Sequence, residues 1–106
     1  MILSRLLENA IYNDLVFKGY DVKIGKTYKG EIDFVAMKDS KKCFIQVAYL
    51  LSDEQVIERE FGAFKSIKAP APKFVLSHDD FDMSRDGITH FNIIDFLLNK
   101  KELFLS

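Results

Sequence analysis

Hydrophobic residues in the first part of the chain recur with the spacing of an amphipathic helix. Between residues 2 and 18 they follow one another at intervals that bring them onto one helical face: Leu3, Leu6, Leu7, Ala10, Ile11 and Leu15. Gly19 comes directly afterwards, where a glycine often ends a helix. The pattern therefore predicts a helix from about Ile2 to Lys18, with this stripe as its buried face.

After this helix, short apolar runs alternate with turn residues, as they do in strands joined by hairpins. A first strand is expected over residues 20–24, and the glycine-flanked segment GKTYKG follows it as a turn. Two more strands are expected over residues 31–37 and 42–50, with a tight turn at Asp39 and Ser40 between them. These runs predict a three-stranded meander.

A helical pattern begins again after the third predicted strand. Ser52, followed three residues later by Gln55, forms a capping-box pattern, which predicts that Ser52 is the N-cap of a helix. The helix is expected to run for about 14 residues. Pro70 and Pro72 break the pattern beyond it. Its expected buried stripe consists of Val56, Ile57, Phe61, Phe64 and Ile67.

The rest of the chain is predicted to form a strand over residues 73–77, a polar loop over 78–87, a strand over 88–93 and a helix over 93–103. The predicted order of elements is therefore α-β-β-β-α-β-β-α. A meander followed by a helical crossover to further strands indicates an α/β fold, with a mixed central sheet flanked by helices.

The composition is that of one folded domain. The chain has 106 residues, of which 48% are hydrophobic and 29% charged, and its net charge is −1. The lone Cys43 cannot form an internal disulfide and suits a reducing compartment. No apolar run approaches the ~20 residues of a membrane span, and the N-terminus lacks the pattern of a signal peptide. We expect a cytoplasmic domain over residues 1–106 that has no membrane partner.

Two polar residues, Asp33 and Gln46, lie inside apolar strands. A tight turn after Lys38 pairs that residue with Lys41, and counting back along both strands places Asp33 directly opposite Gln46. Both a two-residue and a four-residue turn give this register. Side chains opposite each other on one face of a sheet are roughly 4.5–5.5 Å apart at Cβ. Asp33 and Gln46 are therefore expected to converge.

This pair has two interpretations, which the sequence leaves open. In the first, Asp33 and Gln46 satisfy each other and fix the strand register, because an unpartnered buried polar group costs roughly 1–3 kcal/mol. In the second, they bind a metal ion or are what is left of a catalytic site. Glu31 shares a strand face with Asp33, but its place near the start of the strand favours exposure to solvent.

The arrangement resembles that of the PD-(D/E)XK nuclease superfamily. There, an acid in one strand is followed after the turn by an acid or amide two residues before a lysine. The resemblance implies a restriction-endonuclease-like fold with an αβββαβ core. It also implies that Glu8, Asp33 and Gln46 are catalytic and that they bind Mg²⁺ or Mn²⁺ together with the Val47 carbonyl, since Mg²⁺ prefers oxygen ligands.

The chain departs from that pattern at the lysine, whose position is occupied by Ala48. The neutral amide of Gln46 is also a weaker ligand than a second carboxylate. The departure favours a degenerate nuclease-like domain without cleavage activity. The alternative is an active Mg²⁺-dependent DNA endonuclease with a displaced catalytic lysine, for which Lys26 or Lys29 is a candidate.

A second resemblance covers nearly the whole chain. The segments ENAIYNDLVFKGYDVKIGK, EIDFVA, IQVAY, ERE, PKFVLS and DGITHFNIIDFLL, in this order, are similar to the C-terminal domain of a family of prokaryotic AAA+ ATPases. The resemblance implies that residues 1–106 are a single domain excised or truncated from a larger ATPase, in which it acts as a recognition or assembly module. The implied partners are an ATPase domain or a second copy of the chain.

Lysines are concentrated in residues 18–42, where there are seven of them and four acids. Lysines of this kind commonly protect strand edges and ends. The functional alternative is a shallow DNA-binding patch, which counterion release would make weak and salt-sensitive. The segment ERE at 58–60 is expected to be a solvated helix face. His78 and His90 lack the neighbouring ligands that a zinc site needs, which favours structural or surface roles.

Overall fold

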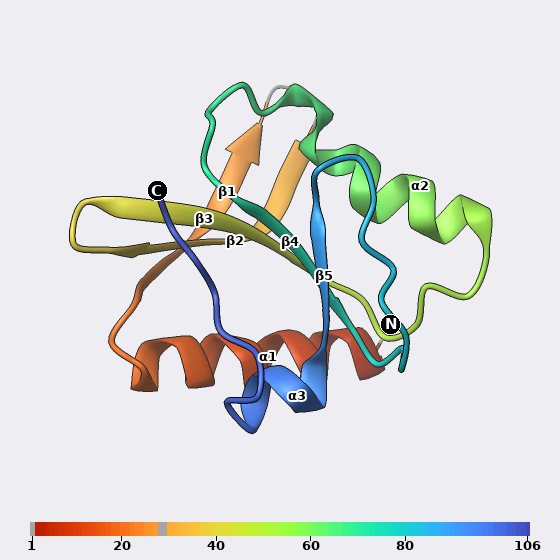
Figure 1. Cartoon of the computed structure of the whole chain (residues 1–106), viewed down its shortest axis with the longest axis horizontal. Coiled ribbons are helices and arrows are strands. Elements are labelled where there is room, and N and C mark those ends of the chain that lie inside the picture. The colour runs from red at the N-terminus through yellow and green to blue at the C-terminus, as the bar shows by residue number, and fades with distance from the viewer. Residues whose placement is uncertain (1, 28–29) are drawn as a thin grey trace.

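The computed structural model describes residues 2–27 and 30–106, and a five-stranded sheet runs through its centre (Figure 1). Neighbouring strands are antiparallel among the first three, whereas the last two run parallel to the third. The predicted α/β fold with a mixed sheet is confirmed. In spatial order the strands are β1 (Asp21–Thr27), β2 (Gly30–Lys38), β3 (Lys41–Val47), β4 (Lys73–Ser77) and β5 (Thr89–Asn92).

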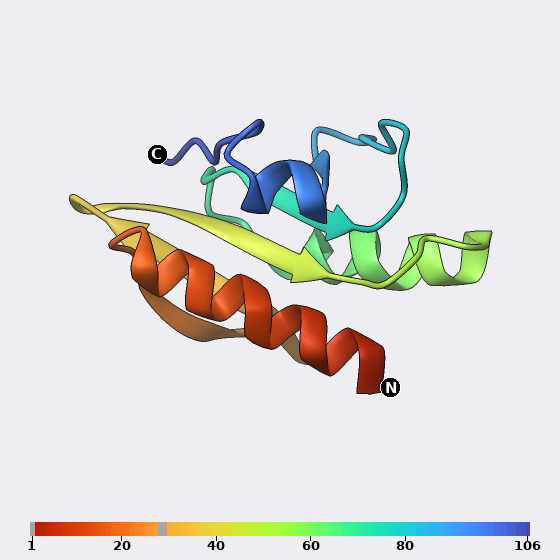
Figure 2. The ribbon, with the colours of Figure 1, turned by 90° about the horizontal axis from the view of Figure 1, so that it is seen from below.

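Helices cover both faces of this sheet. One face carries α1 (Ile2–Phe17) and α3 (Ile93–Leu97), which lie below the sheet in Figure 1 and nearest the viewer in Figure 2. The other carries α2 (Glu54–Gly62), which continues as a 3₁₀ turn, η1 (Ala63–Ser66). The predicted order of helices and strands is therefore correct.

The covering helices create two hydrophobic cores, one on each side of the sheet. Ile11 and Leu15 of α1, which packs on β1, β2 and β3, belong to the first core, and Phe61 and Phe64 belong to the second. Because β3 is covered on both faces, every residue from Cys43 to Val47 is buried. That accounts for its nearly unbroken apolar sequence.

The hairpin between β2 and β3 has the predicted register. Lys38 pairs with Lys41, and the two residues between them, Asp39 and Ser40, have φ values of 54° and 66°. Two successive residues with positive φ form the turn whose twist matches that of a right-handed β-ribbon, and aspartate tolerates this conformation better than most residues.

The predicted buried stripe of α1 is only partly buried. Leu7 packs on the first core beside Ile11 and Leu15, but Leu3, Leu6 and Ala10 are exposed, Leu6 by 58%. The reason is tertiary: α1 touches the sheet along one narrow side. Among the helices described here, the one on the same face of the sheet is the five-residue α3, and so short a helix covers little of the flank of α1 (Figure 2).

Several predicted boundaries also differ from the structure. The N-cap of α2 is Asp53 instead of Ser52, and the helix spans nine residues before η1 takes over. The last helix ends at Leu97, about one and a half turns long. The strand β1 continues to Thr27 and β2 begins at Gly30, so four residues of the predicted turn GKTYKG belong to strands, and its other two, residues 28 and 29, lie outside the described residues. The strand β3 ends at Val47, before the predicted boundary at residue 50.

None of the helices described in the structure is both long and apolar enough to cross a membrane.

Candidate functional site

A hollow of about 780 Å³ opens where the paired part of β2 and β3 ends, between α1 and α2. Its walls contain the polar candidates Glu8, Glu31, Asp33 and Gln46 from the sequence analysis. They also contain an arginine and an acid of α2 that were not candidates, Arg59 and Glu60.

Asp33 and Gln46 converge as predicted. The regular ladder between β2 and β3 runs as far as Phe34 and Ile45, and side chains take over the hydrogen bonds beyond that point. The Gln46 Oε1 atom accepts from the Asp33 backbone N–H at 2.7 Å. The Asp33 Oδ2 atom accepts from the Val47 backbone N–H at 2.8 Å. Each side chain therefore satisfies the backbone of the opposite strand.

These contacts determine how the Gln46 amide is oriented. A backbone N–H can only donate, so the Gln46 atom facing Asp33 must be its oxygen. The Nε2 atom is then the one that reaches Glu60, whose Oε1 accepts from it at 3.2 Å. Gln46 is 6% exposed, and both ends of its amide are occupied. These contacts are the ones expected if Asp33 and Gln46 have a structural role and fix the register of the two strands.

Four carboxylates line the hollow. Glu31 is exposed, whereas the other three are partly buried and come from three different elements: Glu8 from α1, Asp33 from β2 and Glu60 from α2. Burial raises the pKa of Glu8, and the charges of Asp33 and Glu60 raise it further. Burial also raises the pKa of Asp33, against the Val47 N–H, which lowers it. Glu60 follows the same rule: burial raises its pKa, while the hydrogen bond from Arg59 lowers it. The three acids thus repel one another in a partly buried place.

Glu60 is the functional candidate that sequence reasoning missed. The ERE segment was expected to be a solvated helix face, and the Glu58 and Arg59 side chains are indeed 54% and 68% exposed, but that of Glu60 is 12% exposed. A signal was present in the sequence: Glu60 lies four residues from both Val56 and Phe64, within the apolar stripe of the helix. An acid inside such a stripe requires a polar partner, and Gln46 supplies it.

The cation beside these acids is an arginine. Arg59 lines the hollow and its Nε lies 3.3 Å from Glu60 Oε2, whereas Ala48, at the expected lysine position, is buried and apolar. Of the two lysines considered as substitutes, Lys26 is exposed on β1 and does not line the hollow. Lys29 lies outside the described residues.

The donor set does not form a ready metal centre. Carboxylates suit a hard divalent cation, but within residues 2–27 and 30–106 no three His, Cys, Asp or Glu side chains are arranged to hold a metal ion. Gln46 directs its nitrogen toward Glu60, and the backbone N–H of Val47 serves Asp33. The residues therefore fit a cation poorly in this arrangement.

The remaining candidates lie elsewhere. Glu31 is exposed, as expected. His78 is exposed and stacks on Tyr49, with ring centroids 6.1 Å apart.

His90 is buried: its Nδ1 accepts from the Met83 N–H at 3.1 Å, and its Nε2 meets the Ser77 hydroxyl at 2.7 Å. The Met83 contact fixes the proton on Nε2, so His90 donates to Ser77 and cannot act as its base.

Several lysines of the 18–42 region are used within the fold. Lys18 forms an ion pair with Asp14 at 2.7 Å, Lys38 donates to the Lys18 carbonyl at 3.0 Å, and Lys42 lies over the Phe44 ring. Lys23 and Lys26 are exposed on β1, which is an edge strand. These positions suit the protection of a sheet edge.

Comparison with known proteins adds one relative. The chain matches no family model. It is similar to an uncharacterized protein of Haemophilus influenzae (strain ATCC 51907 / DSM 11121 / KW20 / Rd), with 30% identity over 93 residues. The match covers 87% of this chain but only 22% of the relative, so the relative is several times longer than the chain described here.

Proposed function

We propose that this chain is a nuclease-like domain with a degenerate site, and that it acts as a recognition or assembly module of a larger protein instead of cleaving DNA. The observation that carries the proposal is the hydrogen bonding of Gln46. Its oxygen accepts from Asp33 and its nitrogen donates to Glu60. Gln46, which occupies the second ligand position of the nuclease pattern, therefore links two strands and a helix by hydrogen bonds.

The electrostatics of the hollow support the absence of cleavage. Phosphodiester cleavage needs positive charge where negative charge develops on the phosphate. In this hollow Arg59 is paired with Glu60, and Ala48 contributes no charge. The acids outnumber the cations that line it, which disfavours the approach of a phosphate.

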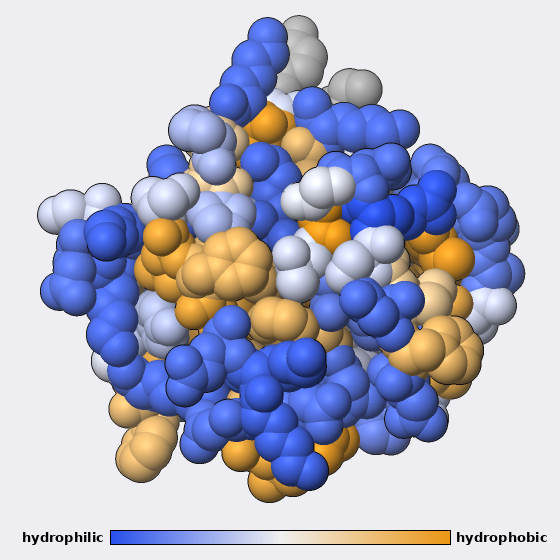
Figure 3. All heavy atoms as spheres, in the orientation of Figure 1, coloured by the Kyte–Doolittle hydropathy of each residue, from blue (hydrophilic) through white to orange (hydrophobic). Residues whose placement is uncertain are grey.

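Two observations support a module that works within a larger protein. The similarity to the Haemophilus influenzae protein extends over 22% of that protein's length. The exposed face of α1 is also apolar, with Leu3, Leu6 and Phe17 exposed by 47%, 58% and 90%. Hydrophobic side chains emerge at the lower edge of the molecule in Figure 3, where α1 and α3 lie in Figure 1. Exposed apolar faces of this kind mark protein–protein contacts.

Metal binding and plasmid nicking test the proposal together. Mg²⁺ and Mn²⁺ would be titrated into wild type and Asp33→Asn by calorimetry, with a supercoiled-plasmid nicking assay in parallel. Asparagine keeps the oxygen that accepts from Val47, so this variant is expected to fold. Asp80→Asn is the matched control, because Asp80 is exposed and lies outside the hollow. We expect no nicking by any of the three proteins.

A second candidate is an active Mg²⁺-dependent endonuclease, and the clustering of Glu8, Asp33 and Glu60 favours it. Carboxylates that raise one another's pKa are relieved by a bound cation as well as by protons. Nicking by wild type and by Asp80→Asn, but not by Asp33→Asn, would establish this activity and reject the degenerate site.

A further inference from the structure

A separate hollow of about 340 Å³ lies on a different side of α2, between that helix with η1 and the turn at residues 85–88. Its floor is apolar and aromatic: Phe61, Phe64 and Ile88 line it, and each is at least nine-tenths buried. Its size is in the range of small-molecule sites, which combine apolar walls with a few placed polar groups.

Gly62 lies at the edge of this hollow, and neither its backbone conformation nor the space around it requires a glycine. Its φ of −65° and ψ of −23° are helical, and any residue adopts them. A Cβ built there would meet no atom of the described chain within 4 Å. Glycine is nevertheless less favourable than alanine in a helix. The missing side chain keeps the hollow open and permits close approach to the backbone.

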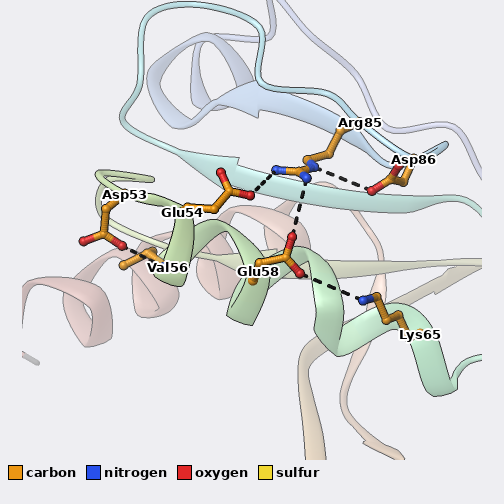
Figure 4. A network of polar contacts seen from close by, with 7 residues as sticks. All are labelled: Asp53, Glu54, Val56, Glu58, Lys65, Arg85 and Asp86. Atoms are coloured by element: carbon orange, nitrogen blue, oxygen red, sulfur yellow. Dashed lines mark hydrogen bonds and ion pairs between the residues drawn. The ribbon is translucent and has the colours of Figure 1, made fainter.

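Arg85 on the opposite lip is neutralised by acids. Its guanidinium lies 3.3 Å from Glu54, 3.5 Å from Glu58 and 3.5 Å from Asp86, and Lys65 lies 3.9 Å from Glu58 (Figure 4). The arginine also sits over the Phe61 ring, 5.9 Å from its centroid. This network forms a side wall and leaves little free positive charge.

Lys73 supplies the uncompensated charge. Lys73 lines the same hollow, and its Nζ donates to the carbonyls of Ala69 and Ala71 at 3.1 and 3.2 Å. Among the described residues no carboxylate lies within 4 Å of it. An ammonium has three donors, so one remains for a ligand. The two carbonyls already hold the side chain in place, which reduces the ordering cost of binding.

We propose that this hollow binds a small aromatic anion. The ring lies on the Phe61 and Phe64 floor beside Gly62, and a carboxylate or phosphate accepts from Lys73. Aromatic side chains favour offset or edge-on contact with a second ring, and a charge-assisted hydrogen bond fixes the orientation of the anionic group. The site is independent of the acidic hollow and does not depend on its proposed function.

Amide chemical-shift titration of the full chain tests this site. The probes are benzoate, phenyl phosphate and adenosine monophosphate, with benzamide as the uncharged analogue of benzoate. We expect saturable shifts at Gly62, Ile67, Gly87 and Ile88, and weaker binding of benzamide than of benzoate. Preference for benzoate or for the two phosphates distinguishes an aromatic carboxylate from a nucleotide as the source of the anion.

Three variants separate charge from shape. Lys73→Gln keeps a donor for the Ala69 and Ala71 carbonyls but removes the charge, and it should weaken benzoate binding roughly tenfold while leaving benzamide unchanged. Gly62→Leu fills the hollow from a helical backbone and should abolish binding of both. Lys68→Gln is the matched control, because Lys68 is exposed and does not line the hollow.

The proposal is wrong if no probe gives saturable shifts around Gly62, or if Gly62→Leu binds as wild type does. Equal weakening by Lys73→Gln and Lys68→Gln would show attraction by general surface charge and would also reject it. A melting temperature near that of wild type is required of each variant. The Gly62→Leu and Lys73→Gln results are independent of each other, so failure of one variant to fold leaves the other decisive.

Discussion

At the scale of single residues, a few buried polar groups join neighbouring segments of the fold through side-chain hydrogen bonds. Gln46, Ser77 and His90 are the polar side chains that the structure shows as buried among its described residues, and each has hydrogen-bond partners. Buried polar groups of this kind specify one arrangement, because any other leaves them unpaired. Gln46 in β3 specifies the arrangement of its own strand relative to β2, through Asp33, and to α2, through Glu60.

Replacement of Gln46 by leucine tests this role. The change roughly keeps the volume but leaves the Asp33 N–H without its acceptor and the Glu60 Oε1 atom without its donor, while Glu60 Oε2 keeps its contact with Arg59. We expect a loss of about 1–3 kcal/mol in the free energy of unfolding, measured with urea. Gln55→Leu is the matched control, since Gln55 is an exposed glutamine on α2, and its effect should stay within about 0.5 kcal/mol.

The raised pKa values of Glu8, Asp33 and Glu60 make stability depend on pH. A carboxyl whose pKa is higher folded than unfolded favours folding below its unfolded pKa, and this contribution disappears as pH rises through the folded pKa. Glu60→Gln keeps an acceptor for Gln46 but cannot ionise. Its stability relative to wild type should therefore increase as pH rises above about 4.5, the ordinary pKa of a glutamate, as urea unfolding at several pH values would show. A constant difference would contradict the repulsion.

His90 should act at a higher pH and in the opposite direction. Burial lowers its pKa below 6.5, against the carboxylates of Asp79 and Asp82, which raise it. Protonation would also place a second donor opposite the Met83 N–H. Wild type should thus lose stability as pH falls below about 6.5 toward the folded pKa. His90→Gln should not show this loss, and an identical pH profile for both proteins would count against the assignment.

At the scale of elements, local signals predicted where helices and strands occur better than where they end. The capping-box pattern pointed to Ser52, yet Asp53 has the extended N-cap backbone, and its Oδ1 accepts from the Val56 N–H at 3.0 Å. Serine and aspartate are both favourable N-cap residues, and the sequence does not show which of the two directly precedes the first helical residue. The path of the chain after β3 makes that choice.

The two candidate caps can be separated by alanine substitution. Asp53→Ala removes the acceptor for Val56 and should cost about 1 kcal/mol of unfolding free energy. Ser52→Ala should change it by less than about 0.5 kcal/mol, because Ser52 is exposed and precedes the cap. Thermal and urea unfolding of the two variants would measure both. A larger effect at Ser52 would restore the capping box.

At the scale of the whole molecule, α1 presents two different apolar sides. Ile11 and Leu15 are fully buried against the sheet, while Leu6 and Phe17 point away from it. Helical spacing alone assigned Leu6 to the buried stripe together with Ile11 and Leu15, because residues three or four positions apart lie on neighbouring parts of a helix. The sheet can cover only one side of a helix, so the other side of α1 stays exposed.

The double change Leu6→Lys and Phe17→Lys tests the use of that side. It removes two exposed apolar side chains and should change the melting temperature by only a few degrees. If α1 is an assembly surface, sedimentation at high protein concentration should show weaker self-association, or weaker binding to an added ATPase domain. Leu15→Ala is the contrasting control and should lose about 2–5 kcal/mol of unfolding free energy. Unchanged association with both partners would remove α1 from the proposed module.

The sequence by itself determined the order of the elements, the hairpin register and the meeting of Asp33 with Gln46. All three follow from local rules: the period of hydrophobic residues, the turn residues, and the alternation of side chains along a strand. The tertiary structure alone decided that Glu60 joins this pair, that Leu3 and Leu6 stay exposed, and that Gly62 opens onto an aromatic hollow beside Lys73. These depend on which side of each helix meets the sheet, and that is fixed by the packing of segments distant in the chain.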